Sequence, residues 1–395
     1  MLYRINPKNG DKLSQLGFGC MRLPKRGNQI NYEKTLELVK SAIDRGINYF
    51  DTAYIYPGSE EALGKAINEL GARDKIKIAT KLPIIFCNSN ADFDKFFMRQ
   101  LERLKTDRID YFLLHMLGSL KSFEKLKSMG IIEWVQEKKA QGKIFNFGFS
   151  YHGDRIDFKK IIDAYDWDFC LMQYNYMDEN NQAGRGGLKY ASSKGLPVFI
   201  MEPLRGGTLA NKLPADAKEV FKKANKERTL AEWSFRWIWN QPEVTLVLSG
   251  MNEMFQLDEN IKTAGTSEQG HLSEEDLNVY VKVLDEVKKN IKIPCTGCGY
   301  CLPCPQGVDI PTCFSCYNES FSQGYFTAVS HYLQLIGAIS AKQNYASKCI
   351  KCGRCEKHCP QKIEISKRMP EVARKLEPFW FKPVFSLGRK ILRIK

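Results

Sequence analysis

Short apolar runs alternate with longer amphipathic segments from about residue 15 to residue 250. Eight of these runs are rich in β-forming residues, and several are almost continuously apolar, as parallel strands covered on both faces should be. The segments between them repeat apolar residues at spacings of three and four, which is typical of amphipathic helices. Eight strands alternating with helices predict an α/β fold, a (β/α)8 TIM barrel. The runs occupy residues 17–23, 47–50, 75–80, 109–115, 143–150, 169–174, 196–201 and 244–250.

An open, doubly wound sheet is the alternative fold for such a pattern. Against it, no G-x-G-x-x-G motif follows the first strand, and the glycine-rich stretches at 183–187 and 204–207 come late. The pattern changes near residue 290, where a cysteine-rich segment begins. We therefore predict a barrel domain over 1–290, a small, mainly helical, cysteine-rich domain over 291–378, and a basic, aromatic tail over 379–395.

Composition and charge narrow the class of protein. A chain of 395 residues that is 43% hydrophobic and 12% aromatic is globular rather than disordered or fibrous.

Without a secretory signal or an apolar run of about 18 residues, we expect a cytoplasmic protein. Residues 342–395 hold 15 Lys and Arg against four Glu, which is +11 of the formal +14. That basic end is interpreted as a solvated tail, a weak contact with anionic membranes or a site for an acidic partner, and no nucleic acid is expected.

Polar residues at predicted strand ends are the catalytic candidates, because in a barrel the carboxyl ends of the strands meet at one mouth. Asp51 ends the second strand, Tyr56 lies in the following loop, Lys81 ends the third strand and His115 the fourth. A tyrosine is a poor acid at neutral pH, but a nearby ammonium lowers its pKa. A carboxylate paired with the lysine would hold that ammonium in place.

The same stretches resemble the aldo/keto reductases. The resemblance rests on FDTAYIYPGSE, ATKLP, DYFLLHMLG, FGFSYH, MQYNYMD, PLRGG and LDEN, which follow one another in the family's order over most of residues 1–265. It implies a barrel that binds NAD(P)H and reduces the carbonyl group of a small molecule. It also implies that Tyr56 donates the proton, that Lys81 and Asp51 adjust the pKa of Tyr56, and that His115 orients the carbonyl oxygen.

The resemblance also implies where the nicotinamide cofactor would bind. Tyr151 stands where the family commonly has Asn, and Met201 stands where an aromatic ring usually stacks on the nicotinamide. Gly250 and Gln256 replace the basic residues that often hold the 2′-phosphate, which removes the usual argument for NADP over NAD. The implied cofactor positions are Ser150, Gln173, Met201, Pro203, Leu204, Gly250, Gln256, Glu259 and Asn260.

Ten of the thirteen cysteines lie between Cys295 and Cys359. Residues 349–360 read C-x2-C-x2-C-x3-C-P, the bacterial ferredoxin spacing, whereas the run from 295 to 305 has two residues before its fourth cysteine. Resemblance to two-cluster ferredoxins implies two [4Fe-4S] clusters. One would be bound by Cys295, Cys298, Cys301 and Cys359, and the other by Cys304, Cys349, Cys352 and Cys355.

Other readings of the cysteines stay open. Paired C-x2-C units also bind zinc, although four evenly spaced cysteines exceed what one tetrahedral site needs. Cys313 and Cys316 form an additional C-x2-C, interpreted as spare thiols on a connecting helix, with a ligand or redox role as the alternative. Cys20, Cys87 and Cys170 are expected to be small buried residues.

Three functional hypotheses result. The first is an NAD(P)H-dependent carbonyl reductase of the aldo/keto reductase type that carries two [4Fe-4S] clusters. In the second, an electron-transfer protein, the clusters exchange electrons with a ferredoxin or flavodoxin and the barrel binds a ligand or partner. The third is an interaction protein whose barrel is a scaffold and whose basic tail binds a membrane or an acidic partner.

Overall fold

The structure is a computed structural model that describes residues 1–153, 155–289, 291–295, 297, 299, 301–322, 324–336, 343–359, 361–381, 383 and 386–387. The chain forms two compact units. The barrel unit comprises Met1–Tyr176, Ala183–Gly206 and Ala231–Leu272, and the helical unit comprises Met177–Gln182, Gly207–Leu230 and Ser273–Lys395. The helical unit also includes segments that precede residue 290. The domain boundaries drawn from the sequence stay a prediction.

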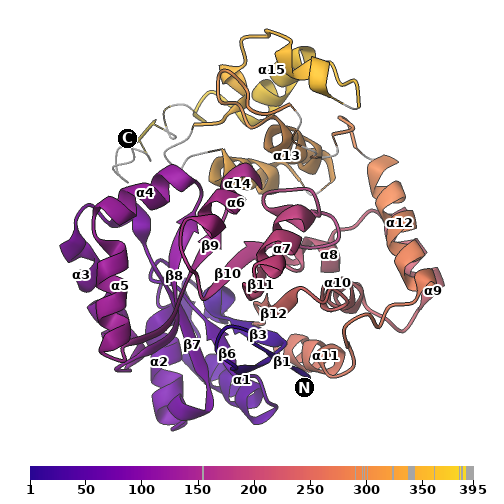
Figure 1. The fold of residues 1–395 in the computed structure, drawn as a ribbon. Helices are drawn as coiled ribbons and strands as arrows, with labels where there is room; N and C mark the ends of the chain where they lie inside the picture. The colour runs from indigo at the N-terminus through magenta and orange to yellow at the C-terminus, as the bar shows by residue number, and fades with distance from the viewer. Residues whose placement is uncertain are drawn as a thin grey trace. The chain divides into compact units, whose positions relative to one another are not determined.

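Eight parallel strands close into a barrel, and each predicted apolar run contributes one of them (Figure 1). Neighbouring strands pair in chain order, and the last strand pairs with the first. The predicted TIM barrel is therefore confirmed. The strands are β3 (Leu16–Gly19), β6 (Tyr49–Asp51), β7 (Lys77–Leu82), β8 (Ile109–Leu117), β9 (Ile144–Tyr151), β10 (Phe169–Gln173), β11 (Val198–Met201) and β12 (Val244–Ser249).

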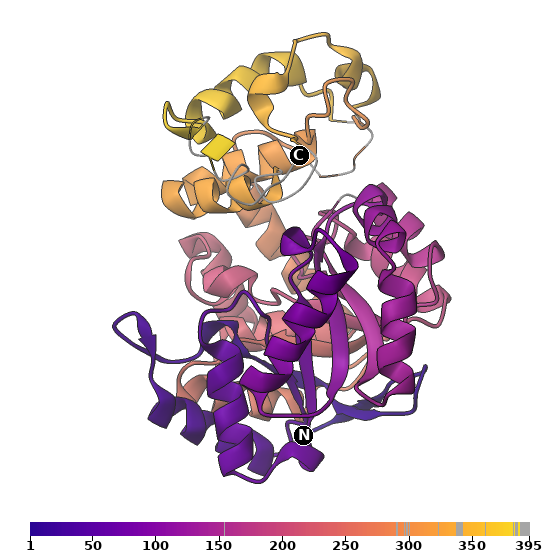
Figure 2. The same ribbon diagram turned by 90° about the vertical axis from the view of Figure 1, so that its left-hand side faces the viewer.

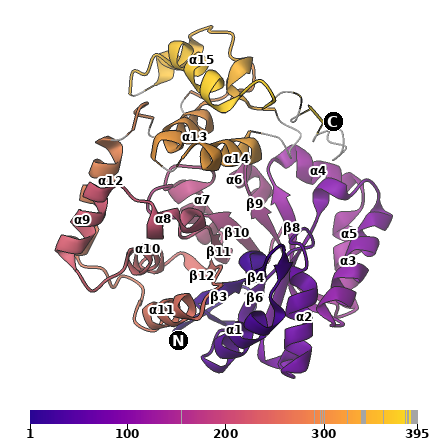
Figure 3. The ribbon, with the colours of Figure 1, turned by 180° about the vertical axis from the view of Figure 1, so that it is seen from behind.

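Amphipathic helices surround the strands, as Figures 2 and 3 show from two further sides. Two short hairpins, β1 (Tyr3–Ile5) with β2 (Lys12–Ser14) and β4 (Lys25–Arg26) with β5 (Gln29–Ile30), complete the unit. The helices are α1 (Tyr32–Asp44), α2 (Ser59–Glu69), α3 (Asn90–Leu104), α4 (Leu120–Ser128), α5 (Ile131–Ala140), α6 (Arg155–Asp163), α7 (Gly184–Ser193), α10 (Leu230–Trp239) and α11 (Met254–Ala264).

The interior of the barrel is packed with side chains rather than open. Tyr49, Tyr111, Phe169 and Phe199 form a cluster whose neighbouring ring centroids lie 5.0 to 5.6 Å apart. All four rings are buried. The aromatic layer shows which side of each strand faces the interior. Because side chains alternate along a strand, it also identifies the residues that point inward at the carboxyl end of the barrel.

The helical unit contains α8 (Thr208–Asn211), α9 (Ala215–Ala224), α12 (Glu274–Lys289), α13 (Ile310–Ser322), α14 (Tyr325–Leu335) and α15 (Ile365–Leu376). Between them run loops with two 3-10 turns, η5 (Ala346–Lys348) and η6 (Arg354–His358). Its core joins Phe314 of α13, Tyr332 of α14 and Met369 of α15. Within the part of the chain that the structure describes, no helix is both long enough and apolar enough to cross a membrane.

Candidate functional site

The strand register brings the predicted site residues to one end of the barrel. Ala79, Leu113 and Leu171 belong to the interior core, and residues two positions further along a strand face the same way. Lys81, His115 and Gln173 therefore point inward at the next level. Asp51 pairs with Ala79 and Ser150 pairs with Leu171, so both also face inward.

A local irregularity in β8 sets the position of His115. The pairing of β8 with β9 shifts register between Leu114 and Leu117, and Met116 has a φ of 58°. A left-handed backbone is costly for a residue with a side chain and clusters at functional sites. The Met116 N–H donates a 2.8 Å hydrogen bond to Ser150 Oγ. That bond links the β8 irregularity to the end of β9.

Lys81 is the centre of the group. Its ammonium donates to Asp51 Oδ2 at 2.6 Å and to the Thr52 carbonyl oxygen at 2.7 Å. The Nζ atom also lies 5.0 Å from the ring centroid of Tyr56, whose hydroxyl it contacts as a hydrogen-bond partner. Only 1% of Lys81 is exposed, so this cation is held by a carboxylate, a carbonyl and a phenol rather than by water.

The pKa of Tyr56 differs from the sequence expectation. Burial raises it, the Lys81 ammonium lowers it, and the carboxylates of Asp51 and Glu202 raise it, with a net value above the ordinary one. The expectation of a lowered pKa was therefore wrong for the net effect, although Lys81 acts in the expected direction. The loss of water around the hydroxyl outweighs the ammonium, so Tyr56 is protonated at neutral pH.

His115 completes the group through a contact with the ring of Tyr56. The two rings meet edge to face with centroids 5.8 Å apart. Burial, together with the charge of Lys81 and the proximity of His152, holds the pKa of His115 well below its usual range. Its buried Nδ1 has no hydrogen-bond partner among the described residues. A neutral imidazole at the mouth can donate a hydrogen bond to a carbonyl oxygen.

A buried polar network behind Lys81 was not predicted from the sequence. Glu60 of α2 accepts hydrogen bonds from Thr80 Oγ1 at 2.7 Å, Gln100 Nε2 at 2.9 Å and Arg103 at 3.0 Å. The Gln100 amide also reaches the carbonyl oxygen of Lys81 at 3.1 Å. A glutamine on the apolar face of the 90–104 helix was the available signal, because a buried amide needs partners.

The residues implied for the nicotinamide cofactor fall into two groups. Ser150 is the penultimate residue of β9 and Gln173 is the last residue of β10. Gln173 pairs with Met201 of β11, which Pro203 and Leu204 follow. The second group lies at the end of β12 and on α11. Gly250 directly follows the strand. Gln256 Oε1 accepts a hydrogen bond from the Asn252 N–H, and the Asn260 side chain donates one to Ser249 Oγ. Glu259 lies beside Asn260 on the helix.

Two charged residues at the mouth were missed by sequence reasoning. Arg22 lies in the turn after β3; its side-chain carbons are 3.6 to 3.8 Å from where a Cβ on Gly250 would lie, and its guanidinium donates to the Gly206 carbonyl. Glu202 is exposed, has a φ of 56°, and places its charge near Tyr56. The aliphatic part of Arg22 thus packs against Gly250, where the family's usual basic residue is missing, and its exposed guanidinium lies close enough to this turn to fit a phosphate-bearing cofactor.

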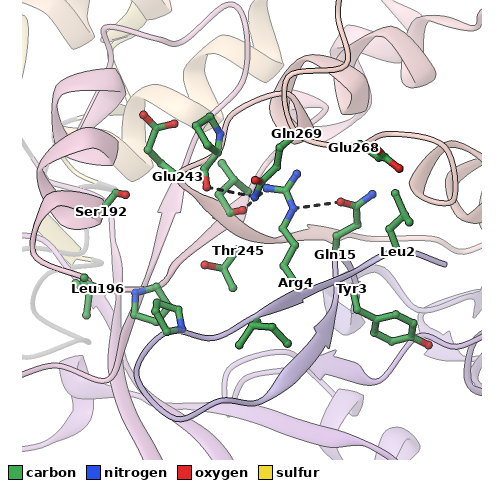
Figure 4. A pocket seen from close by; sticks show the side chains of 16 residues that line it. Leu2, Tyr3, Arg4, Gln15, Ser192, Leu196, Glu243, Thr245, Glu268 and Gln269 are labelled. Carbon is green, nitrogen blue, oxygen red and sulfur yellow. Dashed lines mark hydrogen bonds between the residues drawn. The ribbon is translucent and has the colours of Figure 1, made fainter.

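A separate pocket of about 700 Å³ lies at the other end of the barrel (Figure 4). Pro197 and Val244, which line it, stand at the amino ends of β11 and β12. The buried Arg4 guanidinium donates to Gln15 Oε1 at 3.2 Å and to carbonyl oxygens of residues 239, 241 and 244; burial lowers its pKa to about 10. In TIM barrels this end serves stability, so we assign no catalysis to it.

Two cavities in the helical unit are lined by the clustered cysteines. The first includes Cys295, Cys301 and Cys359, and the second includes Cys304, Cys349, Cys352 and Cys355. Cys298 lies outside the described residues. The Lys351 N–H, in a left-handed turn with a φ of 60°, donates to Cys349 Sγ at 3.4 Å. Such backbone donors to cysteine sulfur accompany iron–sulfur binding.

The other cysteines are core residues. Cys313 and Cys316 lie on α13 and are buried with Phe314 in the core of the helical unit. Cys313 Sγ lies 3.9 Å from the Tyr332 hydroxyl and 3.8 Å from the Asn344 carbonyl oxygen. The three thiols outside the cysteine-rich region are buried as predicted: Cys20, Cys87 and Cys170. Of the predicted tail, residues 382, 384, 385 and 388–395 lie outside the described residues.

Several known proteins resemble this chain over its barrel. L-galactose dehydrogenase of Arabidopsis thaliana is 27% identical over 305 residues, covering 71% of this chain and 93% of that protein. A probable voltage-gated potassium channel subunit beta of the same plant is 26% identical, covering 66% and 90%. An aldo-keto reductase from Bacillus halodurans, solved in its holo form, shares the fold with a TM-score of 0.58, 24% identity and coverage of 72% and 96%.

Family models match both parts of the chain. The Aldo/keto reductase family matches residues 15–280, and a 4Fe-4S dicluster domain matches residues 294–364. The first match covers the barrel strands and the four predicted catalytic residues, Asp51, Tyr56, Lys81 and His115. The second covers all of the cysteines that line the two cavities. The protein is therefore an oxidoreductase of the aldo/keto reductase family that carries a 4Fe-4S domain after its barrel.

Proposed function

We propose that the barrel reduces an aldehyde or ketone to an alcohol with NAD(P)H, and that Tyr56 is the proton donor. The observation that carries the proposal is the buried Lys81 ammonium, which joins Asp51 and Tyr56 at the mouth with His115 against the tyrosine ring. A solved aldo/keto reductase from Klebsiella pneumoniae with the same fold, 22% identical to this chain, contains NADPH.

The bound nicotinamide would supply a hydride to the carbonyl carbon. Tyr56 would give its proton to the carbonyl oxygen, and Lys81 would stabilise the phenolate that results. The neutral His115 would donate a hydrogen bond to the same oxygen and hold it near Tyr56. Ser150 and Gln173 would hold the nicotinamide amide at the ends of β9 and β10.

The reaction is tested with NADPH that carries deuterium at both C4 positions and a panel of small aldehydes and ketones under anaerobic conditions. We expect one deuterium on the carbinol carbon for each NADPH oxidised, as hydride transfer requires. NADPH that binds but delivers no deuterium to any alcohol in the panel would count against the reductase and favour the electron-transfer hypothesis.

Arg22 is proposed to supply the cation for the cofactor phosphate near Gly250. The Arg22→Ala variant should bind NADPH about tenfold more weakly, with a smaller loss for NADH, because one charge-assisted contact to the extra phosphate is removed. Fluorescence titration of both cofactors checks this. Arg26→Ala, another exposed arginine four residues away, is the matched control and should bind like the wild type. Equal losses for NADPH and NADH in Arg22→Ala would contradict the assignment.

We propose further that the helical unit binds two [4Fe-4S] clusters, in the ligand sets given above. The support is the division of the cysteines between two cavities, with four thiols around the second. Among the described residues no three Cys, His, Asp or Glu side chains are arranged to hold a single metal ion. Four thiols spread around a cavity suit a cubane better than one tetrahedral zinc.

Cys355→Ser should lower bound iron from about eight atoms per chain to about four, because one of two cubanes loses a ligand. Cys313→Ser is the control: Cys313 is fully buried in the core, outside both cavities, and this variant should keep its iron. Iron and acid-labile sulfide analysis of anaerobically purified protein measures both. A full iron content in Cys355→Ser would contradict the ligand set.

A further inference from the structure

The two cysteine runs differ sharply in charge and exposure. Between Cys295 and Cys304 there is no charged residue. The loop from Cys349 to His358, here called the basic cluster loop, contains three basic residues and a histidine but only one carboxylate. Lys351, Arg354 and Lys357 are exposed. Cys352 of the second cavity is exposed as well, so this cavity has a ligand at the surface.

Among the described residues, no carboxylate forms an ion pair with the basic side chains of the basic cluster loop. Glu356 accepts hydrogen bonds from the backbone N–H and the hydroxyl of Ser366, at 2.7 and 2.6 Å. Within the described part of the chain, Lys351, Arg354 and Lys357 form no ion pair. By contrast, Lys367 and Arg368 of the nearby helix α15 pair with Glu364 and Glu371. The proposed cluster, with a 2+ core and four thiolates, would carry a charge of about −2 and offset part of this positive charge. The exposed side chains of Lys351, Arg354 and Lys357 remain accessible to an acidic partner.

An apolar residue lies among these cations. Ile350 is 62% exposed and also lines the cavity with Cys304, Cys349 and Cys352. An exposed apolar side chain close in sequence to exposed charged residues is consistent with a protein interface, which has an apolar centre and a polar rim. Complementary charge also speeds and orients the encounter of two proteins.

We propose that the basic cluster loop docks an acidic one-electron carrier protein, and that electrons enter through the cluster held by Cys304, Cys349, Cys352 and Cys355. This inference rests on the clusters proposed above. In each transfer the carrier loses one electron and the cluster core gains it, passing from the 2+ to the 1+ state. No proton or group moves. A reduced flavodoxin would pass from hydroquinone to semiquinone in this step.

The test uses the full-length protein, purified anaerobically, and reduced flavodoxin as the probe. Stopped-flow absorbance follows bleaching of the clusters at low ionic strength. We expect Lys351→Gln/Arg354→Gln to lower the second-order rate constant about tenfold, since steering by charge sets this rate. The matched control, Lys367→Gln/Arg368→Gln, removes the same charge from paired residues and should stay within twofold of the wild type. At 1 M salt the three proteins should converge.

Each result decides the inference. Equal rates for the loop variant and the wild type, or an equal fall in the control, would overturn it. So would loss of binding to phosphatidylserine vesicles in the loop variant with an unchanged flavodoxin rate, because the loop would then serve a membrane. Reduction by dithionite shows separately that each variant keeps its clusters. If the wild type lacks iron–sulfur absorption, the proposed clusters fail, and that failure is distinct from a failure of docking.

Discussion

Tyr56→Phe should lower kcat for carbonyl reduction by about 100-fold to 10,000-fold, because it removes the only proposed source of the proton. The ring itself should stay in place, since its edge-to-face contact with His115 does not involve the hydroxyl. We therefore expect NADPH affinity within twofold of the wild type and unchanged visible absorption from the clusters. Steady-state kinetics, cofactor titration and absorption spectra measure the three quantities.

Tyr54→Phe is the matched control for that experiment. Tyr54 lies in the same loop, but its ring packs against Phe96 at 4.9 Å and beneath the Arg103 guanidinium at 4.4 Å. It should reduce carbonyls at the wild-type rate. If Tyr56→Phe kept more than a tenth of the wild-type activity, the proton would have to come from another group, and the proposed role of Tyr56 would be wrong.

Lys81→Met should have the largest effect on stability, lowering the free energy of unfolding by about 3–5 kcal/mol. The substitution leaves the buried Asp51 carboxylate without the ammonium that lies 2.6 Å away. Burial raises the pKa of Asp51 and Lys81 opposes that rise, so removing Lys81 raises it further. Urea denaturation followed by tryptophan fluorescence measures the barrel, because five of the six tryptophans lie before residue 240.

A second variant separates stability from catalysis. Asp51→Leu/Lys81→Met removes both charges and should recover most of the lost stability, because replacing a buried ion pair with apolar groups is often neutral. Carbonyl reduction should stay abolished, since the tyrosine has lost the ammonium that stabilises its phenolate. A double variant no more stable than Lys81→Met would show that the unpaired Asp51 carboxylate is not the cause of the lost stability.

The barrel could be predicted because the information for it is local. An almost continuous apolar run such as 109–115 indicates a strand covered on both faces, and eight such runs with helices between them have few folds available. Lys81 and the three predicted residues around it, Asp51, Tyr56 and His115, were predicted for the same reason. Each stands at or just after a strand end, and the family motifs that contain them occur in order along the chain.

Other features depended on contacts between distant residues. The net pKa of Tyr56 follows from how completely the closed barrel removes water from its hydroxyl, which no motif encodes. The network of Glu60, Thr80 and Gln100 joins two helices to one strand. The position of Arg22 over Gly250 joins residues more than 200 positions apart.

The sequence by itself determined the barrel, the residues at its mouth and the presence of ferredoxin-type cysteine spacing, because periodicity and motif spacing are properties of short segments. Only the tertiary structure decided which of the described cations form no ion pair and which side chains lose their water. Those properties depend on burial and on distances between remote segments. Closure of the barrel and packing of the side chains determine burial and these distances, and neither can be deduced from the pattern of residues along the chain.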